Sequence, residues 1–156
     1  MLEREKEDLM KHTRLLAAFV PLLLFLLAGC GEPAMPTTSH GGPVRDYVSL
    51  IDHLRAAGAT VVPIGTVTQP FFSVTGQSIT VNGEQVQVYE YANEETASAD
   101  AAHISSDGGT VGNAIVDWTA PPHFYKTGKL LVLYLGTNSS VMNVLSMTLG
   151  PQFAGT

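Results

Sequence analysis

The sequence of 156 residues carries little charge, and little of that charge is positive. Lys and Arg number 8 against 14 Asp and Glu, which gives a net charge of -6. So few basic residues cannot form a stripe that neutralises phosphates, and we therefore exclude a nucleic-acid partner. Hydrophobic residues make up 45% of the chain. This excludes the disordered class, and the length is typical of one domain rather than two.

Cysteine is almost absent, because Cys30 is the only one, and the chain therefore cannot form an internal disulfide. The histidines that follow it are scattered, and no two have the i, i+4 spacing of zinc ligands on a helix; they are His40, His53, His103 and His123. The sequence also lacks a Gly-x-Ser-x-Gly motif and a phosphate-binding loop. We predict no metal site and no cofactor, and the sequence favours a binding protein over an enzyme.

The main apolar run, Leu15–Ala28, is uncharged but shorter than the roughly 20 residues that a spanning helix needs. Its length is typical of the apolar region of a secretory signal peptide. The mostly acidic residues 3–8 do not fit the basic segment that precedes such a region, whereas residues 10–14 do. We therefore expect residues 1–29 to be a signal peptide, with translation starting at Met10.

The apolar run ends in Leu27-Ala28-Gly29-Cys30, which resembles the lipobox of bacterial lipoproteins. The resemblance implies that a diacylglyceryl group is attached to the Cys30 sulfur and that cleavage occurs just before this residue. It also implies that the new amino group is acylated, for example by palmitate. Two or more acyl chains hold a protein durably at a membrane, whereas one gives only marginal binding. The alternative is an ordinary signal peptide followed by an unpaired cysteine.

Residues 30–43 consist of Cys30 followed by a segment rich in Pro, Gly, Ser and Thr. Such a composition has little apolar surface to bury and is typical of a flexible tether. The lipobox resemblance then places the protein on the extracytoplasmic side of a bacterial membrane, held there through its N-terminal lipid. Inner and outer membrane both stay open.

Residues 44–156 are long enough for one domain with its own core. Helical spacing of apolar residues predicts a helix over residues 44–57, which Gly58 ends. Pro63 interrupts the apolar run that follows, so we expect a strand there at the edge of a sheet. A second strand is predicted over residues 71–74.

Asn82-Gly83 lies between two alternating runs and predicts a two-residue hairpin turn over residues 79–88. This turn would place Ile79 opposite Val86 and would leave one face of the hairpin in water. Asn93 is expected to cap a helix that runs to about Ile104.

Residues 114–119 are predicted as a strand, residues 124–135 as a hairpin, and residues 139–149 as a last helix that Gly150-Pro151 ends. The fold class is therefore α+β: a single small domain with a mostly antiparallel sheet and about three helices packed on one face.

The segment from Asp117 to Tyr125 gathers the only Trp with a His, a Phe and a Tyr around two prolines. Rigid aromatic side chains with a polar edge are common in binding surfaces. We expect a binding surface formed by Trp118, His123 and Tyr125. Strand alternation would turn His123 and Tyr125 outward and Phe124 into the core, where Trp118 would join it.

An alternative function uses the same segment. In this alternative the protein is a small envelope hydrolase or ligand-processing enzyme whose site is built from Asp117, His123 and Tyr125. The two hypotheses differ in geometry, since an enzyme needs convergent polar groups in a concave pocket.

A second resemblance covers roughly residues 45–155. Residues 88–94, 122–125 and 149–155 resemble a family of small uncharacterised bacterial lipoproteins, which implies the domain boundaries and no activity. From the sequence we expect a lipid-anchored extracytoplasmic binding or scaffolding protein of the cell envelope, with an envelope protein or a small ligand as its partner.

Overall fold

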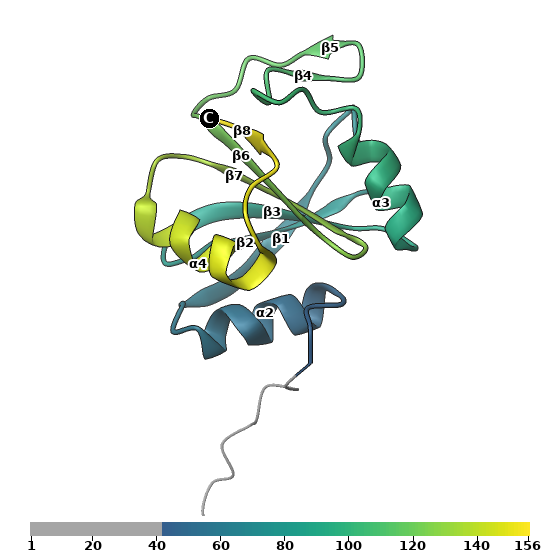
Figure 1. Cartoon of the computed structure of the whole chain (residues 1–156). Coiled ribbons are helices and arrows are strands. Elements are labelled where there is room, and N and C mark those ends of the chain that lie inside the picture. The colour runs from purple at the N-terminus through teal and green to yellow at the C-terminus, as the bar shows by residue number, and fades with distance from the viewer. Residues whose placement is uncertain (1–41) are drawn as a thin grey trace, which may run out of the picture. The chain divides into compact units, whose positions relative to one another are not determined.

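The computed structural model describes residues 42–156. The predicted signal peptide, Cys30 with its lipobox, and the tether as far as Gly41 lie outside the described residues. The elements, shown in Figure 1, are α2 (Tyr47–Ala56), β1 (Val61–Val67), β2 (Gly76–Val81), β3 (Glu84–Glu90), α3 (Glu94–Ala101), β4 (Thr110–Val111), β5 (Ala114–Ile115), β6 (Pro122–Thr127), β7 (Leu130–Leu135), α4 (Ser139–Leu149) and β8 (Ala154–Gly155).

Six of the strands form one sheet in the order β1-β2-β3-β7-β6-β8, and every neighbouring pair is antiparallel. The other two, β4 and β5, form a separate two-stranded sheet, and Val111 of β4 also bridges to Ile104. Helices and an antiparallel sheet in one small domain confirm the predicted α+β class.

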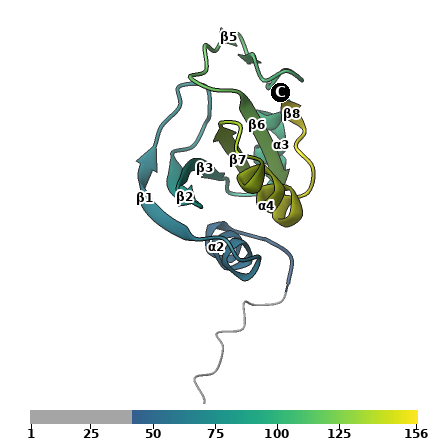
Figure 2. The same ribbon diagram turned by 90° about the vertical axis from the view of Figure 1, so that its left-hand side faces the viewer.

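The three helices do not share one face of the sheet, so this part of the prediction is wrong. Alternate residues of β7 belong to two separate cores. Val132 and Tyr134 lie in the core that also contains residues of α2 and α4, which we call the α2–α4 face. Leu131 and Leu133 lie in the core with residues of α3, the α3 face. Figures 1 and 2 show α3 and α4 on opposite sides of the strands.

The reason lies in β7 itself, whose residues Leu130 to Tyr134 are all buried. A strand that is apolar on both faces needs a cover on both faces. The α2–α4 face receives two helices. The α3 face receives α3, the loop between β1 and β2, and the segment around β4 and β5.

The predicted first helix is confirmed as α2. Asp46 caps it: its carboxylate accepts a hydrogen bond from the Ser49 N–H at 2.8 Å, and the Ser49 hydroxyl oxygen accepts one from the Asp46 N–H at 3.0 Å. This reciprocal pair satisfies donors that a helix start leaves free. Gly58 follows the helix with a φ of 89°, a conformation that glycine adopts without strain.

The predicted edge strand is confirmed as β1, the first strand of the sheet order. The register with β2 shifts between Pro63 and Gly65, and such a bulge beside a proline is typical of an edge. Residues 71–74, in contrast, are turns and bends and not the predicted strand. Phe72 of this loop is buried, with its ring centroid 4.6 Å from that of Tyr89.

The hairpin of β2 and β3 has the predicted register, with Ile79 opposite Val86. Asn82 and Gly83 both have positive φ, 52° and 89°, as the turn requires. The face expected in water is only partly exposed. Gln87 lies on this face, away from the turn, and is buried. Its Oε1 accepts a hydrogen bond from the Tyr89 hydroxyl at 2.6 Å.

Most of the remaining elements agree with the prediction from the sequence. Asn93 caps α3 as predicted, although the helix ends at Ala101, short of Ile104. The β6–β7 hairpin and α4 are confirmed. The predicted strand over residues 114–119 is only the short β5, outside the main sheet. The sequence did not predict β8, which pairs with β6.

Candidate functional site

Trp118 lies in the loop between β5 and β6 and is partly buried on the α3 face. Its indole N–H donates to the carbonyl oxygen of Gly108 at 2.7 Å. Its ring stands edge-on to two others, with centroid distances of 5.7 Å to Phe71 and 5.9 Å to Phe124. The indole therefore joins three separate segments, and its polar atom is already used inside the domain.

Trp118 is part of a longer row of aromatic rings, each in contact with the next. We call it the aromatic row; it consists of Tyr89, Phe72, Phe71, Trp118, Phe124 and Phe153. Tyr89 and Phe124 are fully buried, whereas Phe153 is 41% exposed. The row therefore begins in the core of the α3 face and reaches the surface.

His123 is buried, with only 5% of its surface exposed. Its Nδ1 lies 2.7 Å from Oε1 of Gln152, and its Nε2 lies 2.9 Å from the carbonyl oxygen of Gly136. Both partner atoms are carbonyl oxygens, which only accept hydrogen bonds. The ring also stacks on Tyr134 at 5.8 Å. His123 thus joins the C-terminal segment to the sheet and presents no polar edge to solvent.

Tyr125 is also buried, at 1% exposure, in the core of the α2–α4 face. Burial raises the pKa of its hydroxyl, and a hydrogen bond with Ser146 of α4 opposes that shift. The expectation that His123 and Tyr125 point to solvent is wrong. Alternation does turn them away from Phe124, as predicted, but α4 covers the face toward which they turn.

The predicted binding surface is therefore not one surface. Trp118 lies on the α3 face, while His123 and Tyr125 lie within the opposite side of the sheet. Phe124 is core, as predicted, and Trp118 packs against that core. A contact role for Trp118 stays a prediction.

The three residues of the enzyme hypothesis are not assembled either. Asp117 is exposed in the β5–β6 loop, and Tyr125 lies under α4. Both ring nitrogens of His123 are engaged by Gln152 and Gly136. Within residues 42–156, no group of three or more His, Cys, Asp or Glu side chains is placed to hold a metal ion.

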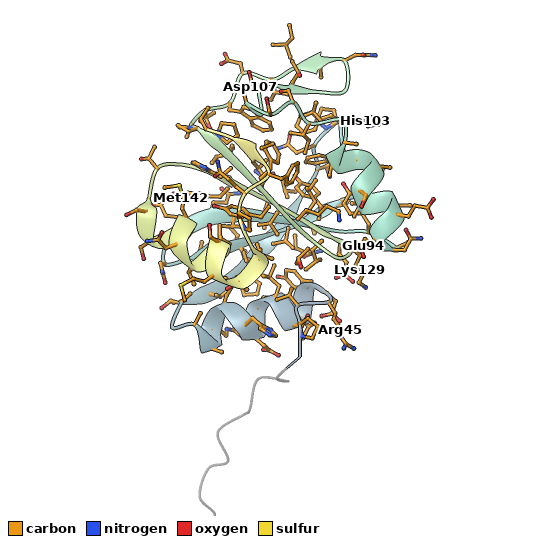
Figure 3. All side chains as sticks on the ribbon, in the orientation of Figure 1. Arg45, Glu94, His103, Asp107, Lys129 and Met142 are labelled. Atoms are coloured by element: carbon orange, nitrogen blue, oxygen red, sulfur yellow. The ribbon has the colours of Figure 1, made fainter. Side chains whose placement is uncertain are left out.

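The structure also contains a hollow that the sequence did not predict. It has a volume of about 510 Å³ and opens at the start of β2 and the end of β3, beside the start of α2. The residues that line the hollow include Tyr47, Thr75, Gln77, Val88, Glu90 and Lys129. They come from α2, the sheet and two loops, and no local sequence pattern could have grouped them. Figure 3 labels Lys129 near Arg45, at the end of the domain where α2 begins.

An ion pair lies at one side of this hollow. Lys129 Nζ is 2.6 Å from Oε1 of Glu90, and the two side chains are 33% and 34% exposed. Oε2 of the same carboxylate accepts the backbone N–H of Tyr47 at 2.9 Å. The hydrogen bond to Glu90 raises the pKa of Lys129. Glu90 therefore connects the first turn of α2 to the sheet and to the β6–β7 turn.

A second polar junction holds α3 in place. One carboxylate oxygen of Asp100 accepts the Ser73 backbone N–H at 2.9 Å, the Ser73 hydroxyl at 2.8 Å and the Tyr91 hydroxyl at 2.9 Å. Burial alone would raise the pKa of Asp100, but the hydrogen bonds from Ser73 and Tyr91 outweigh it and hold the pKa below its usual value. Asp100 thus connects α3 to the β1–β2 loop and to the residue after β3.

Comparison with protein-family models, curated proteins and solved structures finds no match for this chain. In the part of the chain that the structure describes, no helix is long and apolar enough to cross a membrane.

Proposed function

We propose that the protein is a lipid-anchored extracytoplasmic binding or scaffolding protein of the bacterial cell envelope. The observation that carries the proposal is the sequence Leu27-Ala28-Gly29-Cys30 at the end of an apolar run. Cys30 is the only cysteine of the chain, and it stands at the position that the lipobox resemblance assigns to the acylated residue.

The order of the segments supports the same proposal. The Pro-, Gly-, Ser- and Thr-rich residues 31–43 follow Cys30, and α2 begins at Tyr47. A lipid at Cys30 would therefore leave the domain free to reach a partner beyond the membrane surface.

Binding fits the geometry of the domain better than catalysis does. His123 and Tyr125, two of the residues that an enzyme would use, are buried and hydrogen-bonded within the core. The surface features available for binding include the outer end of the aromatic row and the hollow beside Glu90 and Lys129. Concave sites with a few convergent polar groups are the usual places for small ligands.

The proposal is tested by moving the cysteine. Cys30→Ser should shift the full chain from the membrane fraction to the soluble or unprocessed fraction and should abolish incorporation of labelled palmitate. The matched control combines Cys30→Ser with Ser39→Cys, which restores a thiol nine positions downstream of the motif. We expect this control to behave like Cys30→Ser, since the motif and not the thiol directs acylation.

Membrane binding and labelling of Cys30→Ser at the level of the parent would overturn the anchor. Restoration of labelling by the displaced cysteine would contradict the role of the lipobox.

A further inference from the structure

We infer that the hollow beside Glu90 and Lys129 binds a neutral saccharide unit. This inference deepens the proposed binding function by naming the class of ligand. It rests on the volume of the hollow, on the balance of its charges and on the polar groups that it leaves free.

The hollow has the size of a small-molecule site. Its volume of about 510 Å³ falls within the range of about 300–1,000 Å³ that is usual for ligand pockets. Gln77 and Val88 are paired across β2 and β3, so their side chains share one face of the sheet. Tyr47 of α2 lines the hollow beside them and packs on the same core. An open mouth next to rigid strands suits one unit of a longer glycan.

The charges in the hollow cancel. Glu90 and Lys129 are paired at 2.6 Å, and the second oxygen of Glu90 is engaged by the Tyr47 N–H. An anionic or cationic ligand would therefore meet as much repulsion as attraction. A zwitterion would have to separate the Glu90–Lys129 ion pair. Its new contacts with these partly exposed side chains would be weak and would not offset the loss of that pair. An uncharged ligand avoids both costs.

Free hydrogen-bonding groups surround this neutral pair. The Thr75 hydroxyl and the Gln77 amide line the hollow, and no hydrogen bond within residues 42–156 uses either side chain. Together with two spare protons of the Lys129 ammonium they offer donors and acceptors in close succession. Tyr47, which is only partly buried, adds apolar surface. Sugars combine alternating hydroxyl groups with apolar C–H faces and therefore match this lining.

The test uses the purified full chain and two-dimensional amide NMR with a panel of neutral probes: glucose, galactose, N-acetylglucosamine and their β-linked disaccharides. Glycine and alanine serve as zwitterionic probes and glucuronate as an anionic one. For about a dozen ligand heavy atoms, we expect a dissociation constant in the millimolar range. The amide signals of Gln77, Glu90 and Lys129 should shift together as a neutral sugar is added.

Three variants locate the site. Gln77→Ala and Thr75→Val each remove one polar group and should weaken sugar binding about fivefold, which corresponds to one net hydrogen bond of about 1 kcal/mol. Gln85→Ala is the matched control, because Gln85 lies in the same hairpin but does not line the hollow. It should bind as the parent does. The same spectra show whether each variant is folded.

The inference is overturned if no neutral sugar shifts these signals, if an amino acid or glucuronate binds more tightly than every sugar, or if Gln77→Ala and Thr75→Val bind as the parent does. This assay does not depend on lipidation. A failure here would leave the Cys30 experiment untouched. A Cys30→Ser variant that stays in the membrane fraction but gives a normal sugar titration would overturn the anchor and leave the sugar site standing.

Discussion

At the scale of single residues, His123 is a structural residue of the core. His123→Ala would remove a buried ring that makes two hydrogen bonds and stacks on Tyr134. It would also leave the Gly136 carbonyl without its partner. We expect the free energy of unfolding to fall by about 2 to 4 kcal/mol, measured by urea denaturation.

Gln152→Ala is the matched control for this prediction, because it removes one of the two partners and leaves the ring in place. Gln152 is exposed, so its loss should cost about 1 kcal/mol or less. If His123→Ala changes stability by no more than about 0.5 kcal/mol, as is usual for surface sites, the burial of His123 in the native protein is contradicted.

Asp100 should make stability depend on acid pH. Its pKa is held below its usual value by the hydrogen bonds from Ser73 and Tyr91, against the effect of burial. A carboxyl with a lowered pKa stabilises the folded state above the unfolded pKa of about 3.9, and this contribution is lost as the pH falls through the folded pKa. Asp100→Asn should therefore lower the free energy of unfolding by about 1 to 2 kcal/mol at pH 7.

The difference between parent and Asp100→Asn should shrink below about pH 3.9, which urea denaturation at a series of pH values can follow. Asp117→Asn is the control, because Asp117 is an exposed aspartate without a hydrogen-bond partner among the described residues. Its substitution should change the free energy of unfolding by no more than about 0.5 kcal/mol, as is usual for surface sites. A difference for Asp100→Asn that stays constant down to pH values well below 3.9 would show that its charge does not carry the effect.

At the scale of elements, the β2–β3 turn depends on the backbone conformation of Gly83. Its φ is 89°, and a Cβ placed there would meet no atom within 4 Å. Gly83→Val would therefore act through backbone strain alone, which we expect to cost about 1 to 3 kcal/mol. Glu84→Val adds the same side chain next to the turn at a strand position and should be much milder. Equal melting temperatures for parent and Gly83→Val would contradict the turn.

Elements that depend on local chemistry could be predicted from the sequence. The Asn82-Gly83 turn, the Asn93 cap and the Gly150-Pro151 stop each act over a few residues, and each appears where the sequence indicated. Residues 71–74 misled the prediction, because their apolar side chains cover the α3 face from a loop. Apolar composition indicates burial, and it does not distinguish a strand from a loop that covers one.

The arrangement of the helices and the site could not be predicted in the same way. Alternation correctly separated Phe124 from His123 and Tyr125. It could not say which face would be covered, since this depends on where α4 returns after β7. The continuous apolar run of β7 was the one available signal that both faces are buried. The hollow beside Glu90 and Lys129 is assembled from four parts of the chain and had no local signal.

At the scale of the whole molecule, folding should not require the segment before Gly42. The described domain has its own two cores and the complete cap of α2. The preceding residues 31–41 are rich in Pro, Gly, Ser and Thr and have little apolar surface to contribute. A chain that begins at Gly42 should therefore unfold with the same free energy, within about 0.5 kcal/mol, as one that begins at Gly31.

A chain that begins at Tyr47 gives this comparison its control. It lacks Asp46, whose carboxylate accepts the Ser49 N–H, and Val44, which is only 8% exposed. The lost cap alone should cost about 1 kcal/mol, and the loss of the buried valine adds to it. The two truncations therefore place the boundary of the fold between Gly42 and Tyr47. A loss of more than about 1 kcal/mol on removing residues 31–41, a sizeable share of a marginal stability, would instead show that this segment packs on the domain and is more than a tether.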